Sequence, residues 1–150
     1  MIEQILKFEE GFNTHPYLCS EGYVTIGYGT KLHNHKDMNP KDFCLVVNEE
    51  SAMALLKVEV NHIVNRLVAG PYSATFRDLD TVRKDILISM AYQMGTNGLY
   101  GFKNMWIALA ERDYLRAAEE MLDSRWAVQT PNRANRHTLC METGKLHEYI

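Results

Sequence analysis

The stretch that decides the fold is Glu10-Gly11-Phe12-Asn13-Thr14-His15-Pro16-Tyr17-Leu18-Cys19-Ser20-Glu21-Gly22-Tyr23-Val24-Thr25-Ile26-Gly27-Tyr28-Gly29. It begins where a helical pattern ends, and Gly11 can supply the left-handed residue that stops a helix. Residues 17–18 begin an extended segment, and Ser20-Glu21-Gly22 is typical of a turn. The alternation over 24–28 then predicts a strand. The stretch therefore predicts a helix followed by a small hairpin.

Helical patterns dominate the chain beyond this stretch. Asn48 can cap a helix that runs over about 48–69, until Gly70-Pro71 stops it. Asp80 can cap the next helix, whose contiguous apolar pairs are typical of a buried centre. Residues 31–47 lack periodicity and predict irregular or edge structure. Further helices are expected at 104–112, 114–122 and 133–141.

These elements predict an α+β fold in a single domain, residues 1–150. A small antiparallel sheet forms an N-terminal lobe over about 12–47. The helix at about 48–69 joins this lobe to a helical C-terminal lobe. The helical lobe spans about 70–150, and the N-terminal helix at 2–10 belongs to it.

Composition narrows the classes of partner. Apolar residues make up 46% of the chain and charged residues 23%, which suits a packed core. No apolar run approaches the ~20 residues of a membrane span, and the amphipathic N-terminus lacks the apolar region of a signal peptide. We therefore expect that the protein does not insert into a membrane. We also expect that it is synthesised in the cytoplasm. The net charge of −3 and the absence of a basic cluster argue against nucleic acid and give no attraction to an anionic cell wall.

The three cysteines show neither disulfide nor zinc spacing. Cys19, Cys44 and Cys140 are odd in number and widely separated, so we expect reduced thiols and no metal site. A free cysteine is usually a small buried apolar residue, which is our expectation for Cys44 and Cys140. No motif for a cofactor is present.

Three side chains of the hairpin region suit cleavage of a glycosidic bond. That reaction needs a protonated acid at the leaving oxygen and a group opposite it that holds water or stabilises positive charge. Glu10 lies at the negative end of a helix, which disfavours a carboxylate and favours the protonated acid. Cys19 and Thr25 flank the turn, so a hairpin brings them close enough to orient a water molecule. Thr25 and Gly27 share the face opposite the apolar one, and the missing side chain of Gly27 leaves room for a ligand.

Other interpretations of these residues stay open. Glu10 could be a solvated surface acid, and Cys19 and Thr25 could be a buried thiol and a strand threonine bonded to the backbone. A covalent cysteine–histidine mechanism is a further option, because His15, His33 and His35 are nearby in sequence. It lacks a third group to orient the base.

The spacing Glu10, eight residues, Cys19, five residues, Thr25, followed by Ile-Gly-Tyr-Gly, resembles the lysozymes of T-even bacteriophages and the wider group of phage endolysins. In that group the middle residue is Asp or Cys. Two further blocks carry the resemblance across nearly the whole chain: Val82-Arg83 with Met90-Ala91-Tyr92-Gln93-Met94-Gly95, Gly98, Gly101-Phe102 and Asn104, and then Ser124-Arg125-Trp126-Ala127-Val128-Gln129-Thr130-Pro131-Asn132-Arg133-Ala134-Asn135-Arg136.

The resemblance implies a lysozyme-like fold and a role for each matching residue. Glu10 corresponds to the general acid, Cys19 to the catalytic Asp or Cys, and Thr25 to the threonine that positions water. Arg133 corresponds to the arginine that pairs with the acid. Five residues correspond to substrate-contact positions: Lys31, Tyr92, Gln93, Met105 and Glu120, of which Lys31, Met105 and Glu120 differ in type from the T-even residues. Tyr92 could instead belong to the core, and Arg133 could cap carbonyl groups.

The implied activity is that of an endolysin, a peptidoglycan N-acetylmuramidase that cleaves the β-1,4 bond between N-acetylmuramic acid and N-acetylglucosamine without a cofactor. It would be a monomer held in the host cytoplasm until a holin-type membrane protein lets it reach the wall in the periplasm. A lytic transglycosylase acting on the same bond and a non-catalytic wall-binding relative are the alternatives.

Two departures from the T-even pattern change what is expected of the site. Cys19 replaces an Asp and so removes a fixed negative charge opposite the sugar cation. Thr30 stands where the T-even proteins have a salt-bridged histidine, so that bridge is expected to be absent, with Glu59 near its former partner's place.

Overall fold

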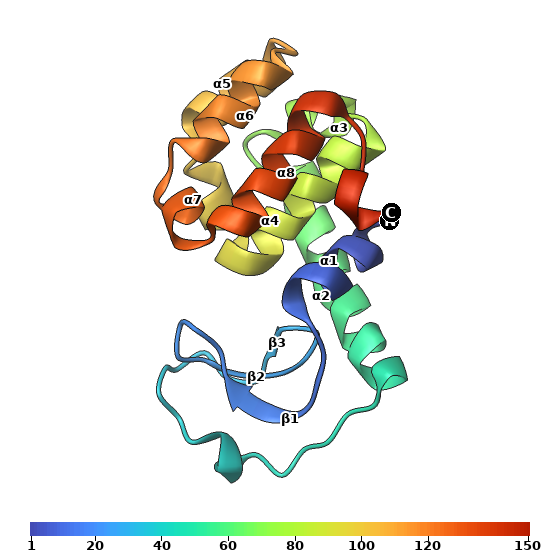
Figure 1. Ribbon diagram of the computed structural model, residues 1–150, viewed down its shortest axis with the longest axis vertical. Helices are drawn as coiled ribbons and strands as arrows, with labels where there is room; N and C mark the ends of the chain where they lie inside the picture. Colours follow the sequence, from blue (N-terminus) through green and yellow to red (C-terminus); the bar gives the residue numbers. More distant parts are fainter. The chain divides into compact units, whose positions relative to one another are not determined.

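The computed structural model describes residues 1–150 and divides them into two compact units (Figure 1). The smaller unit comprises residues 3–60, and the larger one comprises residues 1–2 and 61–150. Helix α2 (Glu49–Ala69) runs through the boundary between the two units. Eight α-helices and one three-stranded antiparallel sheet confirm the predicted α+β class.

The smaller unit combines the N-terminal helix with the sheet (Figure 1). Helix α1 (Ile2–Glu10) buries Ile5 and Leu6 and ends at Gly11, whose φ of 66° is the left-handed value predicted from its position. Strands β1 (Asn13–Leu18), β2 (Val24–Gly27) and β3 (Thr30–Lys31) follow in the order β1-β2-β3. The sequence predicts that this helix belongs to the helical lobe, whereas residues 3–10 belong to the compact unit formed by residues 3–60.

The first strand differs from the prediction at its beginning. It starts at Asn13, so residues 17–18 end the extended segment and do not begin it. Pro16 lies inside this strand, which is possible because β1 is at the edge of the sheet, where a missing N–H group costs little. After β3 the chain is irregular, as predicted, apart from the short 3₁₀ helix η1 (Pro40–Asp42).

The middle strand is covered on both faces. All four residues of β2 are buried. Gly27 has a φ of 65°, and a Cβ atom on it would lie only 2.9 Å from the Cβ atom of Ala52 in α2. The prediction that Gly27 leaves room for a ligand is therefore wrong: it leaves room for helix α2.

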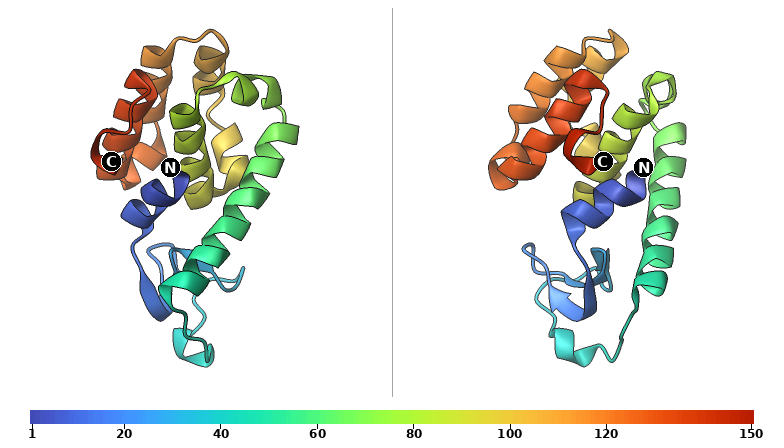
Figure 2. Two further views of the ribbon diagram at one scale, coloured as in Figure 1. Left: turned by 90° about the vertical axis from the view of Figure 1, so that its right-hand side faces the viewer. Right: turned by 45° about the vertical axis from the view of Figure 1, so that its right-hand side comes forward.

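The larger unit is entirely helical (Figure 2). Its elements are α3 (Ser73–Asp78), α4 (Thr81–Tyr100), α5 (Lys103–Ala110), α6 (Tyr114–Leu122), α7 (Arg125–Gln129), α8 (Pro131–Thr143) and η2 (His147–Tyr149). Helix α6 packs against both α5 and α8, and α8 also packs on α4. Ile86, Leu87 and Met90 of α4 have no exposed surface, which confirms the predicted buried centre. The sequence did not predict α3 and α7, because five or six residues are too few for a helical period to show.

The helix caps and the cysteines test two further expectations. Asn48 accepts from the N–H of Ser51 at 2.8 Å, and Asp80 accepts from the N–H of Arg83 at 3.0 Å, so both predicted caps are confirmed.

Cys140 is buried as expected. Cys44 is exposed, so the prediction that it is buried is wrong, because the irregular segment carrying it covers little of its surface. Neither the two long helices nor any shorter one combines the length and apolar character that crossing a bilayer requires.

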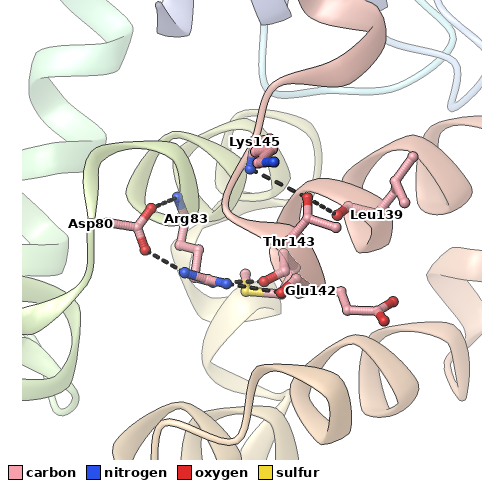
Figure 3. Close-up of polar contacts among 7 residues, drawn as sticks. Asp80, Arg83, Leu139, Glu142, Thr143 and Lys145 are labelled. Carbon is pink, nitrogen blue, oxygen red and sulfur yellow. Dashed lines mark hydrogen bonds and ion pairs between the residues drawn. The ribbon is translucent and has the colours of Figure 1, made fainter.

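One arginine fixes the end of α8 onto the start of α4 (Figure 3). The Arg83 guanidinium donates to the carbonyl oxygens of Met141 at 2.6 Å and Glu142 at 2.9 Å, and pairs with Asp80 at 2.7 Å. These carbonyls belong to the last turn of α8, where no N–H group of the helix is available to donate to them. Gly144 follows with a φ of 70°, and a Cβ atom there would lie 3.0 Å from Nη1 of Arg83. The buried cation thus satisfies the helix end.

We predict that Arg83→Met lowers the free energy of unfolding by about 2–3 kcal/mol, because it leaves buried carbonyls without donors. The matched control is Arg112→Met, which breaks an ion pair with Asp78 whose two side chains are 68% and 59% exposed. That change should cost under about 1 kcal/mol. Equal losses for the two variants in urea unfolding would contradict the role of Arg83.

Candidate active site

The carboxyl group of Glu10 lies against a glycine of the sheet. Glu10 is the last residue of α1 and is half-buried. A Cβ atom on Gly29 would lie 2.8 Å from its Oε2 atom and 3.2 Å from its Cδ atom. Gly29 also has a φ of 77°, so both its backbone and the available space favour glycine. The end of the helix and the turn between β2 and β3 thereby approach more closely than any side chain at position 29 would permit.

One backbone carbonyl connects Cys19 to Thr25. The oxygen of Tyr23 accepts from the N–H of Cys19 at 2.9 Å and from Oγ1 of Thr25 at 2.9 Å. The turn is closed by the N–H of Gly22, which donates to the oxygen of Cys19 at 2.9 Å. Cys19 bonds to this carbonyl through its backbone N–H group and Thr25 through its side chain. That the Cys19 thiol and the Thr25 hydroxyl orient one water molecule stays a prediction.

The hydroxyl of Thr25 retains its capacity to accept hydrogen bonds. Its proton is used in the bond to Tyr23, and a hydroxyl oxygen has two lone pairs. Thr25 is only 2% exposed, whereas Cys19 is half-buried. The structure also shows the backbone bond of the alternative interpretation of Thr25.

Tyr17 joins the acid and the thiol in one electrostatic neighbourhood. Burial raises the pKa of its phenol above the ordinary value of 10.0, and the negative charges of Glu10 and Cys19 raise it further. The charges of Glu10 and Cys19 therefore both act on the Tyr17 phenol. Its Cα atom is also the cross-strand partner of Thr25. The sequence analysis did not select Tyr17, although its position in a strand opposite Thr25 follows once the register of the hairpin is known.

Lys31 lies on the other side of Thr25 in the sheet. The two residues are cross-strand partners in the pairing of β2 with β3. The Lys31 ammonium lies 4.1 Å from the centre of the Tyr23 ring. Thr30, beside it, has a buried Oγ1 atom without a hydrogen-bond partner. The smaller unit therefore gathers Glu10, Cys19, Thr25 and Lys31.

The other predicted site residues belong to the larger unit. Tyr92 is half-buried on α4, and Oε1 of Gln93 accepts from Nε1 of Trp126 at 2.8 Å. Met105, which is fully buried, and Glu120, which is half-buried, line a cavity of about 360 Å³ between α5 and α6. Their contact with substrate stays a prediction.

Arg133 is buried and held by a polar chain that the sequence analysis missed. Its Nη2 atom donates to Ser89 at the carbonyl oxygen, 3.1 Å, and at Oγ, 3.0 Å. Ser89 Oγ also lies within hydrogen-bond distance of Nε2 of His137, at 2.8 Å. Nδ1 of His137 lies 2.8 Å from the hydroxyl oxygen of Tyr149, so both ring nitrogens have a hydroxyl partner.

Burial and the neighbouring arginines favour a neutral His137. Burial lowers the pKa of this ring well below 6.5, and the charges of Arg133 and Arg136 lower it further. The i, i+4 spacing of Arg133 and His137 on α8 is a signal that two polar residues share one face. The sequence alone does not show that this face is buried against Ser89.

Comparisons with known proteins identify a matching family and similar sequences. A family model described as phage lysozyme matches residues 7–138, a range that includes every residue of the candidate site. Two proteins of Dictyostelium discoideum, named probable T4-type lysozyme 1 and 2, are each 31% identical to this chain over 99% of its length and 97% of theirs. The pre-baseplate central spike protein Gp5 of Enterobacteria phage T4 is 29% identical over 97% of this chain and 28% of its own length.

We predict that the free energy of unfolding decreases as the pH falls below 6.5. The unfolded state binds a proton at His137 in that range and the folded state does not, so the stability present above 6.5 is progressively lost. One such group contributes up to about 1.4 kcal/mol per pH unit. Urea unfolding of His137→Asn between pH 7.5 and 5 should show a shallower decline, and the exposed control His15→Asn should follow the wild type. An unchanged slope in His137→Asn would contradict the neutral assignment.

Proposed function

The chain belongs to the phage lysozyme family, and on that premise we propose that it hydrolyses the β-1,4 bond between N-acetylmuramic acid and N-acetylglucosamine. Family membership makes it a glycoside hydrolase of the lysozyme type with peptidoglycan as its substrate. The choice of bond and the residue roles are the proposal. The observation that carries them is the grouping of Glu10, Tyr17 and Cys19 in one neighbourhood, with Thr25 bonded to the same carbonyl as Cys19.

Glu10 acts as the general acid. It donates its proton to the glycosidic oxygen as the bond to the anomeric carbon breaks, so the leaving sugar departs as an alcohol. A carboxyl group that lies against the Cα atom of Gly29 has little freedom to turn away, which keeps the proton aimed in one direction.

Thr25 and Cys19 hold the attacking water. The Thr25 oxygen accepts one water proton, and the Cys19 sulfur offers a second, weaker acceptor. Water then attacks the anomeric carbon on the face opposite Glu10, which is the inverting outcome in a single step. Cys19 lacks the carboxylate that the T-even proteins carry at this position, so Thr25 carries more of the catalysis here.

Residues of the larger unit complete the proposal. We assign Arg133 as the partner of the acid, presented by Ser89 and His137. The substrate contacts assigned to this unit are Tyr92, Gln93, Met105 and Glu120. For Gln93, the bond from Trp126 fixes the amide so that its nitrogen remains to donate to a sugar oxygen.

We further propose an endolysin that remains in the host cytoplasm as a monomer until a holin-type membrane protein opens the route to the periplasm. The similarity to the T-even lysozymes over nearly the whole chain supports this role. Expression in a Gram-negative host tests it: lysis is expected when a holin is co-expressed. Lysis without any membrane-permeabilising agent would contradict the dependence on a holin.

We predict that Glu10→Gln slows the clearing of permeabilised Gram-negative cells at least about 100-fold, because the amide cannot donate the proton. The matched control is Glu9→Gln, a neighbouring acid on the same helix, which should clear as fast as the wild type. Mass spectrometry of the fragments then reports the reaction: reducing muramic acid ends indicate hydrolysis, and anhydromuramic ends would indicate a transglycosylase. Full activity in Glu10→Gln would remove the acid assignment.

A second prediction concerns the Cys19 thiol, tested in a Cys44→Ser background because Cys44 is exposed and would also react. Burial raises the pKa of Cys140 to about 11, so an alkylating agent at pH 8 should leave it unmodified. Alkylated Cys19 should lose at least about tenfold in activity by steric blocking, and Cys19→Ala should lose less. Unchanged activity with Cys19 fully modified, verified by mass spectrometry, would exclude this residue from the site.

A further inference from the structure

A loop of positive charge lies beside the hairpin. It comprises residues 31–36, which Figure 1 shows leading away from β3, and contains two lysines, two histidines and no acid. Backbone bonds hold it at both ends: the N–H of Leu32 donates to Val24 at 2.8 Å and the N–H of Asp37 donates to Gly22 at 2.8 Å. The loop is therefore fixed to the same hairpin that carries Cys19 and Thr25.

Two ammonium groups of this loop share one aromatic ring. Nζ of Lys31 lies 4.1 Å and Nζ of Lys36 lies 5.4 Å from the centre of the Tyr23 ring. Neither lysine takes part in an ion pair. A ring holds an exposed ammonium with only about 0.5–1 kcal/mol and does not neutralise it, whereas a carboxylate forms charge-assisted hydrogen bonds with it. The ring thus positions two cations and leaves their hydrogen-bond donors available.

The histidines add further donors around a cavity. Nδ1 of His33 accepts from the N–H of His35 at 3.0 Å, so the proton of a neutral His33 ring resides on Nε2. The two rings lie 4.9 Å apart. Together with Lys31, Leu32 and Asn34 they line a cavity of about 330 Å³. A space of this size accommodates a carboxylate with the atoms next to it.

The nearest acid of the loop is turned toward the hairpin. Asp37 Oδ1 lies 2.9 Å from where a Cβ atom of Gly22 would be, so its carboxylate is directed at the turn. The whole chain carries a net charge of −3, whereas residues 31–36 carry two lysines and no acid, so the charge of this loop is opposite in sign to that of the chain. A ligand that uses this feature must be an anion.

We propose that Lys31, which lines this cavity with His33 and His35, forms with Lys36 on the shared Tyr23 ring a subsite for a carboxylate of the peptide attached to muramic acid. The assignment rests on the proposed hydrolysis of peptidoglycan, whose peptides carry free carboxylates one or more residues from the glycan. It gives the enzyme a preference for strands that still bear charged peptides, and it places the determinant of that preference on the sheet unit.

Gram-negative sacculi test this subsite, because they lack phosphate-rich wall polymers and so isolate the carboxylate as the anion. One batch is left native, and in a second the carboxylates are converted to amides with a carbodiimide and ammonia. The measured quantity is the ratio of kcat/KM on native to amidated sacculi for the wild type, Lys31→Gln/Lys36→Gln and the control Lys41→Gln, an exposed lysine of η1. We expect a ratio of about ten for the wild type and Lys41→Gln, and a ratio near one for the double variant. Equal ratios in all three proteins, or an equal fall in Lys41→Gln, would overturn the subsite.

Binding of a free peptide separates this proposal from the catalytic one. Titration with the tripeptide L-alanyl-D-glutamyl-diaminopimelate should shift the NMR amide signals of residues 31–36, and the shifts should disappear in Lys31→Gln/Lys36→Gln. This measurement does not require turnover, so it holds even if the wild type were to cleave neither batch of sacculi, a result that would contradict only the proposed hydrolysis. Absence of any shift at millimolar peptide would overturn the subsite while leaving the catalytic assignment intact.

Discussion

The smaller unit depends on the contact between the carboxyl group of Glu10 and the Cα atom of Gly29. A side chain at position 29 would occupy the space of the carboxyl group, and the φ of 77° would strain any residue with a Cβ atom. This approach sets how the end of α1 meets the sheet. The hairpin that places Cys19 and Thr25 on one carbonyl is therefore built at a fixed position relative to Glu10.

The two units use different means to fix their functional side chains. In the smaller unit the backbone does the work, through glycines at positive φ and a carbonyl that accepts twice. In the larger unit buried side chains do it: Ser89 and His137 hold Arg133, and Arg83 holds the end of the helix that carries it. A backbone device tolerates changes in most neighbouring side chains. A buried polar chain does not, because removing one member leaves the others without partners in a medium of low dielectric.

Local signals in the sequence predicted the elements well, and long-range packing explains what they missed. The caps at Asn48 and Asp80 could be recognised because capping depends on residues three positions apart. The role of Gly27 could not, because nothing local distinguishes a glycine that admits a helix from one that admits a ligand. The grouping of Glu10, Cys19 and Thr25 followed from the turn and the family pattern. Tyr17 required the strand register, and the Ser89–His137 bond joins residues 48 positions apart.

The distribution of charge explains how an acidic chain can act on an anionic polymer. Net charge governs long-range attraction, which salt screens beyond about 10 Å, whereas recognition takes place at contact distance. Cys19 carries no fixed negative charge where the T-even proteins have Asp, and the loop over 31–36 concentrates donors on the same hairpin. In the subsite that we propose, both features reduce local repulsion of peptide carboxylates. A local positive subsite of this kind recognises its ligand at contact distance, whereas general attraction to the wall would bind the enzyme to any anionic surface that it met.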